Sequence, residues 1–234
     1  MTRRPFLASL LTIAVAWTSL AACGSPSFEY VRNTEAKTAF KVPHEWTLFD
    51  EAVMQGDPSG VQASTPDTAE WLVGLDADPS PAREHVLSLD GGYDTAFPQG
   101  IAGVFRLSTL ARDRVDLEEL RNLLIPIDQI LDEVGVEAVS MIAYDDRLDV
   151  DGFRGLHLEA QISMSALETV VGIGGGAGSA SVLVNDDYLH INQTAYIDSG
   201  TDKVYLLAVL CSADCYARNH GDIETVVNSW AVIA

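Results

Sequence analysis

The chain has 234 residues, of which 47% are hydrophobic, as is ordinary for a protein with a globular core. It carries 34 acidic side chains against 14 basic ones, a formal net charge of −20. Nucleic acids and anionic lipid headgroups are bound through clustered Lys and Arg, so this charge excludes both as partners.

The first 22 residues have the three parts of an export signal. A basic start, Arg3-Arg4, is followed by an apolar stretch from Phe6 to about Leu20 and by small residues before Cys23. The stretch is shorter than the about 20 residues that a transmembrane helix needs. We therefore predict a signal peptide over residues 1–22.

Leu20-Ala21-Ala22-Cys23 resembles a bacterial lipobox. The resemblance implies cleavage before Cys23, a diacylglyceryl group on its thiol, and a flexible lipidated tether over residues 23–27. Two acyl chains hold a protein stably on a membrane. The predicted location is the outer face of the cell membrane, with the lipid at Cys23 as the anchor; a plain secretory signal with an incidental cysteine is the alternative.

The export route stays open. Thr2-Arg3-Arg4-Pro5-Phe6-Leu7 resembles the twin-arginine pattern, whose translocase carries folded cargo, and it also fits the basic start of the general route. Cleavage would remove Arg3 and Arg4 and no acid, which leaves 34 acids against 12 bases in the mature chain.

Short extended segments open the globular part at residues 28–31, 39–42 and 46–49. Pro43 predicts a turn between the last two. Residues 54–69 are rich in Gly, Pro, Ser and Asp and predict a loop, after which residues 71–75 and 104–109 predict strands.

The clearest helix spans residues 116–134. Its apolar residues recur at alternating steps of three and four: Leu117, Leu120, Leu124, Ile127, Leu131 and Val134. Asp116 with Glu119 predicts a capped start and Gly135 a stop. Pro126 predicts either a kink or two short helices in sequence.

Four further strands are predicted at residues 139–144, 156–162, 188–197 and 203–210, the last two joined by a hairpin turn. Residues 203–210 are apolar almost throughout, which places that strand centrally in a sheet covered on both faces. A closing helix would bury Ile223, Val226, Val227 and Trp230. The predicted class is α+β, with a mainly antiparallel sheet flanked by helices.

Both ends of the globular part resemble PsbP-like domains. Phe40-Lys41-Val42-Pro43-His44-Glu45-Trp46 resembles their F-x-V-P-x-x-W opening. The stretch 204–210 with Cys211, Cys215, Tyr216 and Asn228-Ser229-Trp230 is similar to the last strand and helix of actinobacterial lipoproteins with this domain. The resemblance implies a single α/β/α sandwich over residues 28–234 and a non-catalytic scaffold or binding role, and it carries over no functional residue. The chain has eleven arginines and only three lysines, alongside abundant Ala, Val, Gly and Asp. Such usage is typical of a high-GC genome and favours an actinobacterial source.

With Cys23 lipidated, Cys211 and Cys215 remain as an even pair in an oxidising compartment. The simplest prediction is one disulfide closing a tiny loop. The alternative is a zinc site of Cys211, Cys215 and His220, with His157 as a distant fourth ligand.

Other motifs predict no cofactor or metal. Gly172–Gly178 lacks the strand, helix and acid of a dinucleotide fingerprint and predicts a loop. The stretch from Asp145 to Gly152 places Arg147 and Leu158 where a calcium loop needs oxygen, and predicts an acidic turn. His157-Leu158-Glu159 lacks the remaining signature of a zinc deaminase, and there is no G-x-S-x-G.

One group of residues predicts a candidate site. Side chains of alternating polarity share one face of each of two strands: His157, Glu159 and Gln161, then Tyr188, His190, Asn192, Thr194 and Tyr196. If the strands are neighbours in register, these side chains line one polar, aromatic-edged surface that would bind a ligand. The alternative is a solvated sheet face, or one capped by a helix and satisfied by hydrogen bonds.

The predicted function is that of a membrane-anchored extracytoplasmic lipoprotein that binds an envelope protein or a small molecule and catalyses nothing. The alternative is an envelope-associated hydrolase or other enzyme with His157, Glu159 and His190 as acid, base or metal groups.

Overall fold

A computed structural model of the chain describes residues 27–54, 68–87, 96–150, 152–171, 188–200 and 202–233. The predicted signal peptide, Cys23, most of the loop predicted over residues 54–69 and the Gly172–Gly178 segment lie outside the described residues. Within the described ranges, we find no helix with the length and apolarity required to cross a membrane.

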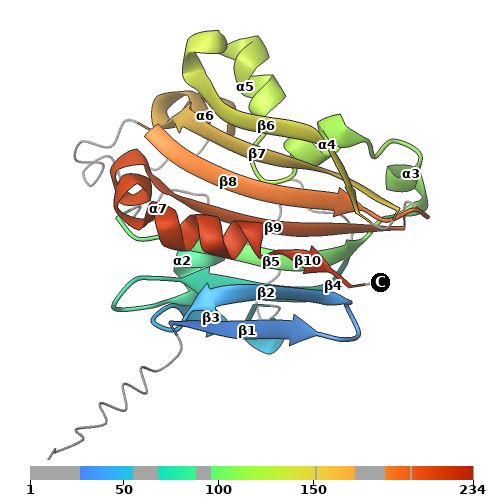
Figure 1. The fold of residues 1–234 in the computed structure, drawn as a ribbon. Helices are drawn as coiled ribbons and strands as arrows, with labels where there is room; N and C mark the ends of the chain where they lie inside the picture. Colours follow the sequence, from blue (N-terminus) through green and yellow to red (C-terminus); the bar gives the residue numbers. More distant parts are fainter. Residues whose placement is uncertain are drawn as a thin grey trace, which may run out of the picture.

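The strands form two antiparallel sheets (Figure 1). They are β1 (Phe28–Asn33), β2 (Thr38–Pro43), β3 (Thr47–Phe49), β4 (Thr68–Asp76), β5 (Gln99–Arg106), β6 (Val139–Val150), β7 (Phe153–Ser163), β8 (Tyr188–Ile197), β9 (Lys203–Ser212) and β10 (Ala231–Val232). The large sheet has the order β3-β4-β5-β9-β8-β7-β6 and the small sheet β1-β2-β10. The predicted central strand is therefore confirmed, since β9 lies fourth of seven.

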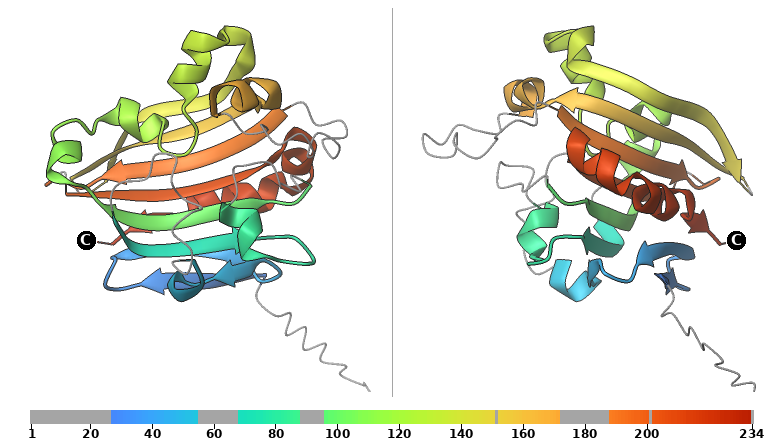
Figure 2. Two further views of the ribbon diagram at one scale, coloured as in Figure 1. Left: turned by 180° about the vertical axis from the view of Figure 1, so that it is seen from behind. Right: turned by 60° about the vertical axis from the view of Figure 1, so that its left-hand side comes forward.

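The helices cover both faces of the large sheet. They are α1 (Glu51–Met54), α2 (Arg83–Leu87), α3 (Thr109–Arg112), α4 (Leu117–Arg121), α5 (Ile127–Glu133), the 3-10 helix η1 (Val136–Ala138), α6 (Met164–Val171) and α7 (Ala213–Asn228). Helices α1 to α6 pack on one face, and α7 and the small sheet pack on the other (Figures 1 and 2). The described residues thus have the predicted α+β architecture of an antiparallel sheet flanked by helices.

An aromatic cluster joins the small sheet, the large sheet and the end of α7. Trp71 of β4 stacks on Trp230 with ring centroids 6.4 Å apart, and Phe40 of β2 lies 5.9 Å from the Trp230 ring. All three are buried. Apolar burial of this size, about 1.5–3 kcal/mol for each large side chain, anchors β2 to the sheet beneath it.

The strand predicted at residues 104–109 is displaced in the structure. Strand β5 runs over Gln99–Arg106, and Thr109 begins α3 after Ser108, whose side chain accepts a hydrogen bond from the backbone of Ala111. Gly100 and Gly103 weaken the apolar pattern of β5 in the sequence. Gly100 is needed there because a Cβ would lie 2.7 Å from the carbonyl oxygen of Ala208 on β9.

The predicted helix over residues 116–134 is two short helices. Asp116 caps α4 by accepting hydrogen bonds from the backbone of Glu118 and Glu119, Pro126 precedes α5, and Gly135 follows it at φ +119°. A residue with that φ favours glycine. The cap, the break and the stop are all confirmed.

Two loop predictions were too long. Met54 ends α1, and residues 68–69 belong to β4, so the loop predicted over residues 54–69 is wrong at these three positions. The acidic stretch from Asp145 extends β6 to Val150, and only residues 151–152 separate it from β7.

Candidate functional site

Strands β7 and β8 are neighbours in the register that the sequence required. His157 lies opposite Thr194, Glu159 opposite Asn192, and Gln161 opposite His190. Residues directly opposite in an antiparallel pair point to the same face. The structure therefore brings the predicted polar side chains of the two strands together.

Helix α7 covers the β8 half of this face. His190 is only 2% exposed, and Asn192 is fully buried. On its other side β8 buries Leu189, Ile191, Ala195 and Ile197. The β8 half is thus capped by a helix and is not open to a ligand, whereas His157, Glu159 and Gln161 of β7 are half-buried beside it.

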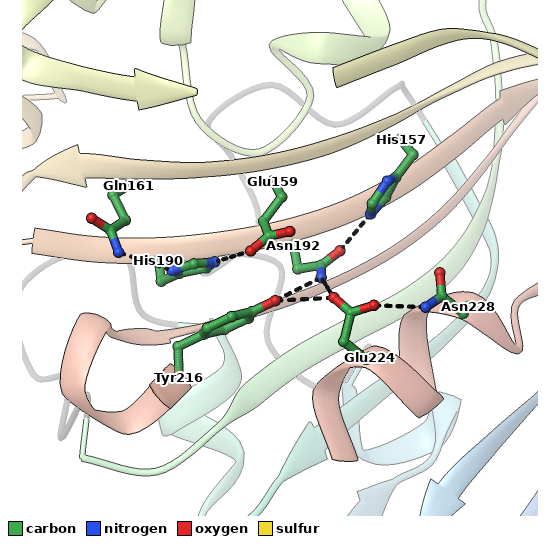
Figure 3. Close-up of polar contacts among 8 residues, drawn as sticks. All are labelled: His157, Glu159, Gln161, His190, Asn192, Tyr216, Glu224 and Asn228. Carbon is green, nitrogen blue, oxygen red and sulfur yellow. Dashed lines mark hydrogen bonds and ion pairs between the residues drawn. The ribbon is translucent and has the colours of Figure 1, made fainter. Parts of the chain in front are cut away.

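Hydrogen bonds fix the state of His190 (Figure 3). Its Nε2 lies 3.1 Å from Oε1 of Glu159, and its Nδ1 lies 3.4 Å from Nε2 of Gln161. A carboxylate only accepts and an amide nitrogen only donates, so Nε2 carries the proton and Nδ1 accepts. The imidazole is therefore neutral, and it stacks on the Tyr216 ring with the centroids 3.4 Å apart.

Asn192 connects both strands to α7 (Figure 3). Its Nδ2 donates to Oε1 of Glu224 at 2.9 Å and to the Tyr216 hydroxyl at 3.2 Å, while its Oδ1 lies 2.9 Å from Nε2 of His157. The Tyr216 hydroxyl donates to Oε1 of Glu224 at 3.0 Å, and Asn228 donates to Oε2 at 2.7 Å. Each polar side chain drawn in this cluster is held by at least one neighbour.

Burial shifts two pKa values in the cluster. It lowers the pKa of His190, and the nearby Glu159 carboxylate offsets this only in part. Burial, together with the charges of Glu159 and Glu224, raises the pKa of Tyr216 despite the opposing hydrogen bond from Asn192. Both shifts favour the neutral side chain.

The two predicted tyrosines lie outside this cluster. Tyr188 stands at the exposed start of β8. Tyr196 is buried at the far end of the same strand, where its ring lies over Gly155 so closely that a Cβ there would be 2.4 Å from the ring. Tyr188 and Tyr196 flank the cluster without joining its hydrogen bonds.

Sequence reasoning missed the half of the cluster that α7 contributes. Tyr216, Glu224 and Asn228 are separated by eight and four residues, about two helical turns and one, so they share one helix face. This polar stripe beside the apolar one was a readable signal. It predicts a helix that buries polar groups against polar groups.

Cys211 and Cys215 form the predicted disulfide, with their Cα atoms 5.8 Å apart. The bridge joins the end of β9 to the first turn of α7. Ser212 also caps this helix, because its side chain accepts a hydrogen bond from the backbone N–H of Cys215. Bonded sulfurs are not available as thiolates, so the zinc alternative with His220 and His157 is wrong.

A second buried group lies at the end of β4. The Asp76 carboxylate accepts hydrogen bonds from the backbone of Asp78 and Ala82 and lies 2.9 Å from Nδ1 of His85. These contacts close the turn that leads into α2. Among the residues that the structure describes, no three His, Cys, Asp or Glu side chains are grouped as metal ligands.

Comparison with known proteins gives structural neighbours only. Scans against protein-family models and against curated proteins found no match. Among solved structures, the chain is similar to cyanobacterial PsbP (CyanoP) of Synechocystis, with a TM-score of 0.44 and 16% identity over 91% of this chain and 98% of that one. It is also similar to the Ran-binding protein Mog1p of Saccharomyces cerevisiae, with a TM-score of 0.42 and 9% identity over 88% and 95% of the two chains.

At these TM-scores and identities neither neighbour bears on function. The α+β architecture follows from the sheets and helices of this chain itself.

Proposed function

We propose that this protein is an extracytoplasmic lipoprotein, anchored through Cys23 to the outer face of the cell membrane, that acts as a non-catalytic binding or scaffold module with a PsbP-like domain. The lipobox-like Leu20-Ala21-Ala22-Cys23 supports the anchor. The Cys211–Cys215 bridge is in keeping with an oxidising compartment.

The burial of His190 under α7 is the observation that counts against catalysis at this cluster, and it means that a binding surface has to lie elsewhere on the chain. A general acid or base has to reach the proton of a substrate, within about 3 Å or through one water. Both ring nitrogens of His190 are engaged, and the ring is stacked under Tyr216. For His190 to act as the enzyme alternative requires, α7 would have to leave the sheet, although α7 is bonded to β9 through the disulfide.

Intact-mass spectrometry of the full chain, expressed in a bacterium that processes lipoproteins, tests the anchor. We expect a species that lacks residues 1–22 and carries the mass of a diacylglyceryl group. Cys23→Ala should abolish this species, and Ser27→Ala, a few residues further on, should leave it unchanged. An unmodified chain, or lipid that persists in Cys23→Ala, contradicts the anchor.

Incubation with purified envelope polysaccharide and peptide tests the non-catalytic part. We expect no product by mass spectrometry from the native chain or from His190→Gln. Turnover by the native chain that His190→Gln removes would establish the enzyme alternative instead.

A further inference from the structure

The outer edge of β6 combines backbone groups without a strand partner and exposed apolar side chains. β6 ends the large sheet, and its one neighbour among the described strands is β7. Met141, Ile142 and Tyr144 are 42%, 49% and 39% exposed. An edge strand with such side chains is a template for pairing with another chain.

The register assigns the two sides of this edge different chemistry. Met141 lies opposite Ala160 and Tyr144 opposite Leu158, so both stand on the face that carries α4 and α5. Ser140 and Asp145 lie opposite Gln161 and His157 on the other face, that of the polar cluster. A strand added here would meet apolar side chains on one face and polar ones on the other.

On the apolar face of the edge, the Arg121 guanidinium of α4 lies 5.8 Å from the centre of the Tyr144 ring. The acids Glu137, Asp145 and Asp146 are exposed at the edge of a chain whose net charge is −20, so the field there is negative. A field of this sign attracts a cationic segment and repels an acidic one.

A second copy of this chain fits the edge poorly. Each copy carries a net charge of −20, so two copies repel each other.

We propose that the outer edge of β6 docks an extended segment of a partner polypeptide in which apolar and cationic residues alternate. The segment extends the sheet by main-chain hydrogen bonds, covers Met141 and Tyr144 with its apolar side, and faces the acids with its basic side. This inference deepens the proposed binding role and rests on it, but it is independent of the lipid at Cys23.

A synthetic peptide that alternates valine and lysine is the probe, used with the purified full chain. Binding followed by fluorescence anisotropy should weaken by about tenfold or more in the double variant Met141→Lys/Tyr144→Lys, which removes apolar contact and adds like charge. The matched control is Tyr30→Lys/Val53→Lys. It makes the same change at two exposed apolar residues, one of them on the edge strand β1, and should bind as the native chain does.

Hydrogen exchange and two further peptides locate the contact. Bound peptide should slow amide exchange in residues 139–146 and leave β1 unchanged. A peptide with glutamate in place of lysine, and one with its backbone amides methylated, should both fail to bind. Circular dichroism checks that each variant is folded.

Several results would overturn the inference. These are no binding of the valine–lysine peptide, equal loss in the control variant, equal binding of the glutamate peptide, or concentration-dependent dimers that Met141→Lys/Tyr144→Lys dissolves. A lipidated chain that fails these tests overturns the docking edge alone. An unlipidated chain that passes them overturns the anchor alone.

Discussion

Strands β7 and β8 bury their two faces in different ways. Toward α4 and α6 they present mainly apolar side chains, among them Leu158, Ile162 and Ile191, which are fully buried. A polar exception on this face is Gln193, which is also buried and whose Nε2 donates to the backbone oxygen of Leu120 at 2.8 Å. Toward α7 they present His190 and Asn192, which are equally hidden but held by hydrogen bonds. Burial alone therefore does not distinguish a hydrophobic core from a polar cluster. The distinction lies in whether the buried side chains pack as apolar groups or form hydrogen bonds.

The difference predicts different costs of disturbance. On the apolar face, the cost grows with the volume of packing that is lost. On the polar face, it grows with the number of partners left unpaired in a water-poor space. The predictions that follow test each side of this comparison.

Leu158→Ala should have the largest effect. The side chain is fully buried in the apolar core, and deleting it should cost about 3 kcal/mol of the free energy of unfolding, through lost transfer energy and a cavity. Urea denaturation of the purified chain measures this. Met141→Ala, at the exposed edge on the same face, is the control and should cost within about 0.5 kcal/mol. Equal costs would mean that the apolar face is not packed as described.

Asn192→Ala should come next, at about 2 kcal/mol, because it leaves His157, Tyr216 and Glu224 without a shared partner. The check is a double-mutant cycle with Tyr216→Phe, also by urea denaturation. We expect a coupling energy of at least about 0.5 kcal/mol between the two changes, since they break one network. Strict additivity would contradict a connected cluster.

Reduction of the Cys211–Cys215 bridge should cost about 2 kcal/mol or less, the low end of the usual range, because the loop it closes is so short. Unfolding is compared with and without reductant. The variant Cys211→Ser/Cys215→Ser should have the same free energy of unfolding with and without reductant. A native chain that is insensitive to reductant would show that the bridge does not hold α7 on the sheet.

The sequence predicted what depends on local pattern. Strand β8 was predicted with its observed bounds, and the central place of β9 in the sheet followed from its apolar run. Pro126 predicted the break between α4 and α5. The shared face of β7 and β8 followed from strand alternation and was confirmed by the register.

What could not be read from the sequence depends on tertiary contact. Gly100 interrupts the apolar pattern by which β5 could have been predicted, and it is there because the backbone passes close to β9. The polar stripe of α7 could be read from the sequence, but it did not show that the helix would lie over His190, since Tyr216 and Glu224 are at least 26 residues further along the chain. Alternating polar residues are typical of a strand with one face in solvent, but the same pattern also occurs where that face is buried. Which of the two forms depends on whether a helix with polar side chains packs on the face.

A pH dependence should also separate the polar face from the apolar one. Burial lowers the pKa of His190 in the folded chain. As the pH falls through about 6.5, the unfolded chain takes up a proton at this residue and the folded chain does not. Stability from His190 is therefore complete above about pH 6.5 and is lost as the pH falls below it, by at most about 1.4 kcal/mol per pH unit.

His190→Gln isolates this contribution, because glutamine keeps hydrogen-bonding groups but does not titrate. The free energy of unfolding of both chains is measured from about pH 8 to about pH 5, a window in which histidine is the side chain that ordinarily changes charge. Burial raises the pKa values of acids such as Glu70 and Asp128, but their ion pairs and hydrogen bonds outweigh it and lower them overall. The stability that these acids contribute is also lost at low pH, but equally in both chains, so it cancels in the difference. The advantage of the native chain over His190→Gln should shrink as the pH falls. An advantage that stays constant, or that grows on acidification, would mean that His190 is not held neutral beneath Tyr216, and the contrast between the two faces would then rest on geometry without a matching difference in charge.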